Sequence, residues 1–143
     1  MSTLFLIVFF ENSILYEDLW HNISRIFILG GTTMEKLIKN IDKSEIIRLA
    51  DKVAYECGKV ASLTLAQRPG IGITVMAFDE NTDISTHTAL GDALVYIFEG
   101  KASITINNKE YILKAGESVV MPCGVPHSVK AVTKFKMLLA VVR

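Results

Sequence analysis

From residue 60 onward, the chain consists of short apolar or β-branched runs that are separated by residues typical of turns. Pro69-Gly70, the polar loop 79–83, Gly100 and Asn107-Asn108 each end a run after a few residues. Such runs are too short for ordinary helices but match strands. The pattern therefore predicts an all-β sandwich or barrel, with eight strands at 60–66, 71–78, 94–98, 103–106, 111–113, 118–121, 128–132 and 135–142.

A different pattern precedes the strands. Asp42 and Glu45 have the spacing of a capping box, in which each side chain satisfies a free backbone donor at a helix start. Apolar residues then recur at helical spacing, and Gly58 is a typical helix terminator. We expect a short amphipathic helix near 43–55, so that residues 34–58 form a helical lead-in and residues 59–143 form the β domain.

Residues 1–33 differ in composition from the rest of the chain. They contain one of the fifteen basic residues, Arg25, together with the only tryptophan and four of the seven phenylalanines. Residues 30–34, Gly-Gly-Thr-Thr-Met, can be encoded as GGAGGN-ACN-ACN-ATG, which resembles a bacterial ribosome-binding site ahead of a start codon. One hypothesis is that translation begins at Met34 and that 1–33 is translated leader. The alternative is an ordinary N-terminal extension.

Charge and cysteine content exclude several classes of function. Lys+Arg and Asp+Glu are equal at 15 each, so the chain lacks the basic excess by which proteins bind nucleic acid or an anionic membrane surface. The apolar run Leu4 to Phe10 is too short to cross a membrane and lacks the flanks of a signal peptide. Cys57 and Cys123 are too few for a disulfide scaffold. We therefore expect a cytoplasmic protein with reduced thiols.

The region around His127 carries the most specific motif. Gly116, Pro122, Gly124 and His127 match G-x5-P-x-G-x2-H-x3-N at every spacing, and only the last position differs, because Ala131 replaces Asn. Proteins of the cupin family share two sequence motifs, and this is the second of them. The chain resembles that family over about residues 56–143. The resemblance implies a small single-domain bacterial cupin with the type-2 conserved barrel. The fold of such proteins is a jelly-roll barrel, which is also called a double-stranded β-helix.

The first cupin motif, G-x5-H-x-H-x3,4-E-x6-G, fits less completely. His87 and Gly100 occupy family positions, whereas Asn81, Ala89 and Ala93 replace the first Gly, the second His and the Glu. In metal-bearing cupins, three histidines and the glutamate hold the ion. The resemblance therefore implies that only His87 and His127 remain as ligands here.

Two imidazoles are fewer protein ligands than catalytic zinc or non-haem iron sites use. The other potential donors are His21, Asp92 and Cys123. His21 lies in the possible leader, strand alternation directs Asp92 away from the side of Ala93, and the turn around Cys123 predicts no direction for its thiol. We expect no tightly bound metal, and a divalent transition metal on the two histidines stays as the weaker possibility.

The alanines have a second implication, since small side chains at family ligand positions enlarge a pocket and make it apolar. We expect His87, His127, Ala89, Ala93 and Met137 to line a ligand pocket, in which the imidazoles act as hydrogen-bond partners or as a general acid or base. Two purely structural alternatives stay open. Either the histidines are core residues that are hydrogen-bonded to backbone carbonyls, or bulky neighbours fill the barrel and leave no pocket. By parity, further lining residues are Val95, Ile97 and either Met76 or Phe78.

Three functions fit these observations. The first is binding of a small organic ligand, without an assigned activity. The second is a metal-dependent cupin enzyme, an isomerase, decarboxylase or dioxygenase, with a reduced ligand set. The third is a scaffold role. The resemblance also implies a homodimer, for which the apolar region Val60 to Leu65 offers a symmetric interface.

Overall fold

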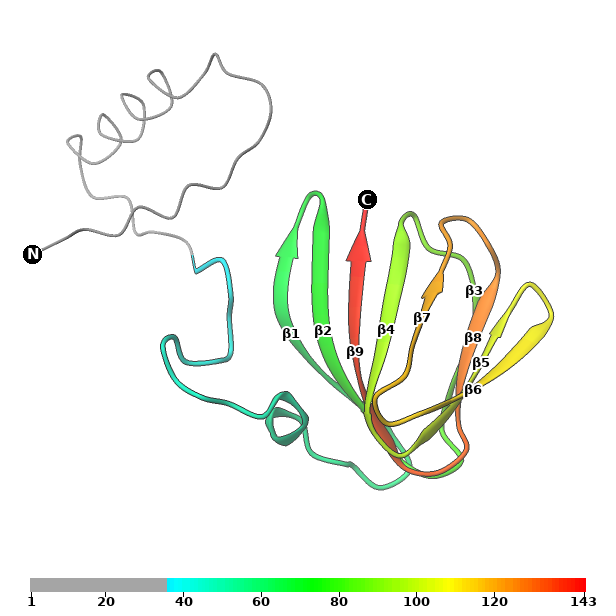
Figure 1. The fold of residues 1–143 in the computed structure, drawn as a ribbon, viewed down its shortest axis with the longest axis horizontal. Helices are drawn as coiled ribbons and strands as arrows, with labels where there is room; N and C mark the ends of the chain where they lie inside the picture. Colours follow the sequence, from blue (N-terminus) through cyan, green and yellow to red (C-terminus); the bar gives the residue numbers. More distant parts are fainter. Residues whose placement is uncertain (1–35) are drawn as a thin grey trace, which may run out of the picture. The chain divides into compact units, whose positions relative to one another are not determined.

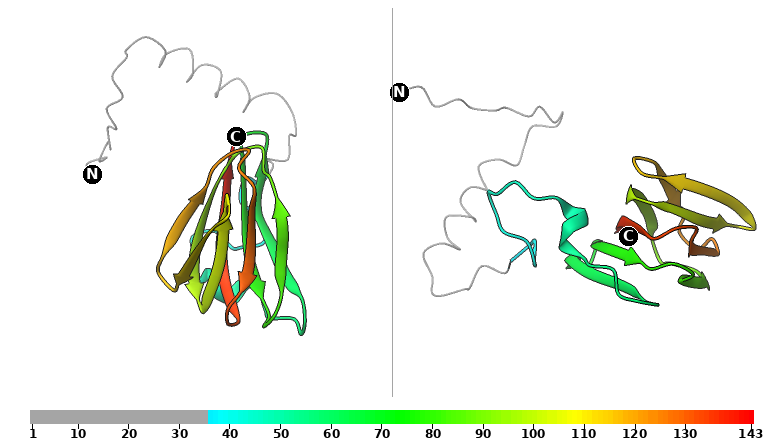
Figure 2. Two further views of the ribbon diagram at one scale, coloured as in Figure 1. Left: turned by 90° about the vertical axis from the view of Figure 1, so that its right-hand side faces the viewer. Right: turned by 90° about the horizontal axis from the view of Figure 1, so that it is seen from below.

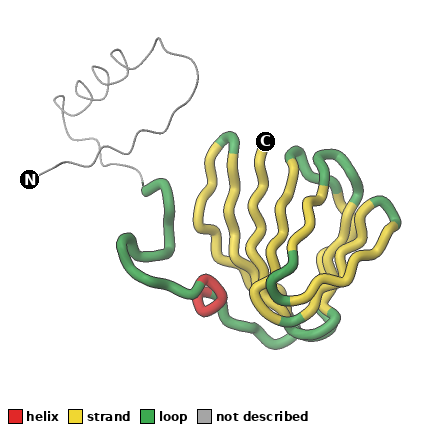
Figure 3. The backbone as a smooth tube through the Cα atoms, viewed as in Figure 1, coloured by secondary structure: helices red, strands yellow, loops and turns green. Residues whose placement is uncertain are grey.

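The computed structural model describes residues 36–143, so the predicted leader 1–33 lies outside the described residues. Within this range the regular structure is strand apart from one short helical turn (Figure 3), and no helix in it is long and apolar enough to span a membrane. The elements are η1 (Leu49–Lys52), β1 (Val60–Arg68), β2 (Ile71–Phe78), β3 (Asp83–His87), β4 (Asp92–Glu99), β5 (Lys101–Ile106), β6 (Lys109–Lys114), β7 (Ser118–Met121), β8 (His127–Ala131) and β9 (Phe135–Val142).

The strands form two antiparallel sheets. Sheet A has the order β1-β2-β9-β4-β7 and sheet B the order β3-β8-β5-β6 (Figure 1). The sheets converge at one end, at the bottom of Figure 1, and diverge at the other; Figure 2 shows them from the side and from below. We call the first the narrow end, where β2 ends and β9 begins, and the second the wide end, where β3 ends and β8 begins.

One hydrophobic cluster fills the space between the sheets. Alternate residues of a strand face the same side, so Ala93, Val95 and Ile97 of β4 all point inward, and none is more than 2% exposed. At the narrow end, the rings of Phe78 and Phe135 stack with centroids 4.4 Å apart. The two rings therefore pack the core at the narrow end.

The predicted amphipathic helix at 43–55 is not present. The segment contains only the four-residue 3-10 turn η1, flanked by extended backbone at Arg48 and Val53, and Arg48 makes no side-chain cap hydrogen bond. Ser44 has a φ of 61°, which interrupts a helix. Short helices gain little by themselves, so packing decides the conformation. Two of the apolar residues expected on a helix face, Leu49 and Val53, instead cover the outer face of sheet A, where they belong to the cluster of the buried residues Leu65, Val75 and Ala77. Ile46 is exposed.

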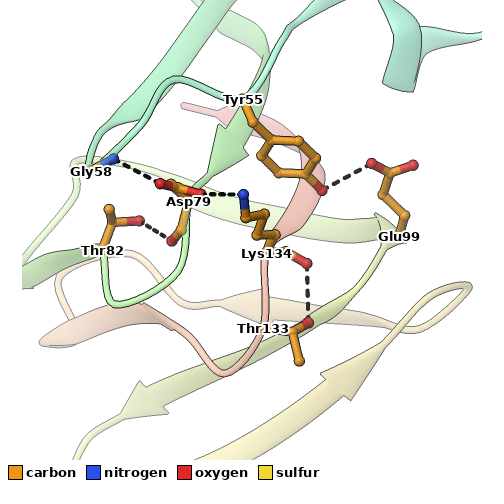
Figure 4. Close-up of polar contacts among 7 residues, drawn as sticks. All are labelled: Tyr55, Gly58, Asp79, Thr82, Glu99, Thr133 and Lys134. Carbon is orange, nitrogen blue, oxygen red and sulfur yellow. Dashed lines mark hydrogen bonds and ion pairs between the residues drawn. The ribbon is translucent and has the colours of Figure 1, made fainter.

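Asp79, directly after β2, links the lead-in segment to the narrow end (Figure 4). Its Oδ2 accepts a 2.7 Å hydrogen bond from the backbone N–H of Gly58, and its Oδ1 lies 3.0 Å from Nζ of Lys134. The Gly58 hydrogen bond, followed by the bond to Lys134, lowers the pKa of Asp79 below its ordinary value. The carboxylate thus joins three segments that are distant in sequence.

Tyr55 makes a second link at this end. Its hydroxyl donates a 2.9 Å hydrogen bond to Oε1 of Glu99, which also lies 3.6 Å from Nζ of Lys136 (Figure 4 shows the Tyr55–Glu99 bond). Burial, together with the bond to Glu99, raises the pKa of Tyr55 above its ordinary value. Lys136 also donates to the carbonyl of Ala50. These polar contacts hold the lead-in segment in place against the barrel, although it forms no α-helix within the described range.

The edge of β1 bears on the predicted homodimer. Lys39 N–H donates to the Leu65 carbonyl at 2.7 Å, and the Asn40 side chain donates to the Thr64 carbonyl at the same distance. The chain's own lead-in therefore occupies part of the edge that a second copy would use. A homodimer through Val60 to Leu65 stays a prediction.

Candidate functional site

His87 and His127 lie side by side at the wide end. His87 is the last residue of β3, His127 is the first residue of β8, and the two are direct cross-strand partners. Their ring centroids are 4.5 Å apart, with the planes inclined at 65°. His127 is 2% exposed, whereas His87 is exposed to solvent. The sequence-predicted histidine pair is therefore brought together.

The loop before β8 sets the position of His127. Gly124 has a φ of 71°, a conformation that favours glycine, and its N–H donates a 2.9 Å hydrogen bond to the Ala89 carbonyl. Asp92 accepts a 2.8 Å hydrogen bond from the backbone N–H of Cys123. The loop that follows His87 and the loop that precedes His127 are thus tied to each other, and the carboxylate of Asp92 adds to this contact.

Backbone carbonyls fix the chemical state of both rings. Nδ1 of His87 lies 2.9 Å from the Ser85 carbonyl oxygen, and Nδ1 of His127 lies 2.8 Å from that of Val125. A carbonyl only accepts, so each Nδ1 carries the hydrogen and donates it. In the neutral imidazole, each Nε2 then has a free lone pair. The site therefore offers two neighbouring acceptor nitrogens. The sequence did not indicate the backbone carbonyls that bind Nδ1 of each ring.

The residues near this end are apolar. Ala93 is 2% exposed and pairs with Met121 on one side and Val141 on the other, all at the wide end of sheet A. Ile106 of β5 pairs directly with His127. Ala89 lies in the loop between β3 and β4, half-buried. Ile106 is therefore an apolar neighbour of His127, and a pocket lined by Ala89 and Ala93 stays a prediction.

Met137 is a predicted lining residue that the structure places elsewhere, and the same holds for its strand partner Ile97 and for Phe78 at the narrow end. It is 1% exposed, belongs to the central core cluster and pairs with Ile97. Val141, the partner of Ala93, is four residues farther along β9, about 13 Å at the usual rise of a strand. Met137 thus packs in the lower barrel, away from the level of the histidines.

The donor set does not fit a tightly held metal ion. In the described range 36–143, no group of three or more His, Cys, Asp or Glu side chains is arranged to hold one. His21 lies outside the described residues, and catalytic zinc sites use three protein ligands. Two imidazoles leave a divalent ion mostly hydrated, so no chemical step is assigned to a metal here.

Comparison with known proteins agrees with the geometry. The family model described as "Cupin domain" matches residues 74–142. A conserved protein of unknown function from Streptococcus pyogenes is 40% identical, with a TM-score of 0.75 over 78% of this chain and 97% of that one. A cupin superfamily protein from Desulfitobacterium hafniense is 26% identical, with a TM-score of 0.71 over 73% and 96% of the two chains.

A cupin 2 conserved barrel domain protein from Leptotrichia buccalis is 38% identical, with a TM-score of 0.67 over 68% of this chain and 47% of that one. Salicylate 1,2-dioxygenase from Pseudoaminobacter salicylatoxidans is 21% identical over 58% of this chain, with a TM-score of 0.55, and shares the fold alone. No curated protein sequence matches. The motif around His127, the two-sheet barrel and these relatives together show that the chain belongs to the cupin family.

Proposed function

We propose that this cupin binds a small organic molecule at the wide end of its barrel, where His87 and His127 contact it. The observation that carries the proposal is the pair of Nδ1–H to carbonyl hydrogen bonds, which leaves both Nε2 lone pairs for a ligand. A few fixed polar groups among apolar side chains are the usual composition of small-molecule sites.

The histidines are poorly explained as packing residues alone. A core histidine is satisfied when both ring nitrogens have partners. Here, within the described part of the chain, each ring has one hydrogen bond, through Nδ1. His87 is exposed to solvent whereas His127 is buried, so the pair lies at the boundary between solvent and the barrel interior. This arrangement supports recognition of a molecule that enters from outside.

A metal-dependent enzyme is the second function that the family resemblance implied. It rests on ligands that Ala89 and Ala93 do not supply. Catalysis without a metal is compatible with the proposal, because an unprotonated Nε2 is a suitable general base.

The test is a fragment screen by thermal shift, followed by titration of each hit into His127→Ala and His87→Ala. Removal of one hydrogen bond to a ligand typically costs about 0.5 to 1.5 kcal/mol, so we expect affinity to fall by up to about tenfold in each variant. His87 is exposed, so its variant keeps the experiment valid if His127→Ala unfolds. Hits that bind both variants as tightly as the parent protein contradict the proposal.

A further inference from the structure

The strand register extends the histidine pair into a row across sheet B. His87 pairs with His127, His127 pairs with Ile106 of β5, and Ile106 pairs with Lys109 of β6. Direct cross-strand partners project from the same face of a sheet. Lys109 therefore belongs to the inner face at the wide end, on the same level as the histidines.

Alternation along β6 supports this placement. Leu113 is 5% exposed and belongs to the core cluster between the sheets, and Tyr111 packs against that cluster. Residues 109, 111 and 113 share one face of the strand because side chains alternate. Glu110, on the opposite face, accepts a hydrogen bond from Ser103.

Lys109 is held by an aromatic ring and not by a carboxylate. Its Nζ lies 5.0 Å from the ring centroid of Tyr111, within the range of a cation–π contact. In the described chain, none of the ion pairs includes Lys109. An ammonium group that is positioned over an inward-facing ring and lacks an acidic partner is a suitable contact for an anion.

We infer that the wide end binds an organic acid that also carries a hydroxyl group, with the carboxylate on Lys109 and the hydroxyl donating to the imidazole pair. Adjacent strands are about 4.8 Å apart, so His127 and Lys109 are separated by about 10 Å at the backbone. The flexible lysine side chain shortens that span. Ile106 lies between them, so the body of the ligand is apolar. This inference rests on the proposed function and adds the ligand class.

The experiment uses three fragment sets of matched size: hydroxylated carboxylic acids, their methyl esters and hydroxylated primary amines. Each set is titrated into isotope-labelled protein while the side-chain NMR signals of His87 and His127 are followed. We expect the acids to shift these signals, the esters to act more weakly and the amines to act least. A charge-assisted hydrogen bond contributes more than a neutral one, so the acids should lose about tenfold or more in affinity in Lys109→Gln.

Lys114→Gln is the matched control, because Lys114 is on the same strand but alternation places it on the opposite face from Leu113. It should leave binding unchanged, and Lys109→Arg should restore much of the affinity. If esters or amines bind as well as acids, or if Lys109→Gln has no effect, the ligand class is wrong although the site stands. If no fragment of any set shifts either histidine, the ligand class is wrong, and the proposed function itself fails only if hits of the thermal-shift screen also leave both histidine signals unchanged.

Discussion

Replacement of Gly100 by alanine is expected to destabilise the barrel by about 3 to 5 kcal/mol. Gly100 connects β4 to β5 at the narrow end with a φ of 78°, which side-chain-bearing residues rarely adopt. An added Cβ would lie 1.9 Å from the Lys134 carbonyl oxygen and 2.8 Å from the Cα of Phe135. Both obstacles belong to the backbone at the start of β9, so the clash cannot be relieved by turning a side chain.

Gly116→Ala is the matched control for this change. Gly116 has a similar φ of 88°, but no atom lies within 4 Å of an added Cβ. It should therefore lose only the backbone term, about 1 kcal/mol. Urea unfolding of the two variants, with the midpoint and slope compared, measures the difference. Equal losses at the two positions would mean that the turn at residue 100 is not packed against β9.

Restoration of the two absent family ligands is expected to create a metal site. The variant Ala89→His with Ala93→Glu adds an imidazole and a carboxylate to His87 and His127, which raises the number of donors from two to four. Sites with three or more such ligands bind zinc and related ions far more tightly than a histidine pair does. We expect affinity for Zn²⁺ or Mn²⁺, measured by titration with a competing chelator, to rise by about 100-fold or more.

The same variant with His127→Ala is the control for this gain, and most of the added affinity should disappear. Ala93→Glu alone should be less stable than the parent, because it places a carboxylate at a position that is 2% exposed. Added metal should recover part of that stability in Ala93→Glu, which has three donors, and more of it when residue 89 is also histidine. If the parent protein already binds the ion as tightly as the variant, the account of the reduced donor set is wrong.

Strands with clear apolar patterns could be predicted closely from the sequence. The predicted strands at 71–78, 118–121 and 135–142 are confirmed with the same bounds as β2, β7 and β9. β3 was missed: four of its five residues, Asp83–His87, are exposed, and the strand lies at the edge of sheet B. An edge strand with little burial lacks the apolar alternation on which strand prediction depends.

The lead-in was predicted wrongly for a different reason. Apolar residues that are spaced like one face of a helix can also be buried by an irregular segment that packs on a sheet. Val53 and, in part, Leu49 are buried in this way against sheet A. The local pattern shows that these residues will be buried, but tertiary contacts decide the backbone conformation.

The site was predictable in part. The motif spacings identified His87 and His127, and their meeting at the wide end is confirmed. Two features depend on long-range strand pairing or backbone geometry and have no sequence signal: the carbonyl partners of Nδ1 and the position of Lys109 on the histidine row. Met137 was included by parity alone, which gives the face of a strand but not the height within the barrel.

The imidazole tautomers are the feature on which the proposed ligand recognition depends. Long-range ¹H–¹⁵N correlation spectra of the side chains, recorded at alkaline pH, report which ring nitrogen of His87 and of His127 carries the hydrogen. Protonated Nδ1 and bare Nε2 in both rings, with a cross-relaxation signal between the two, is the predicted outcome. Hydrogen on Nε2 in both rings, or rings too far apart to exchange that signal, would contradict the account.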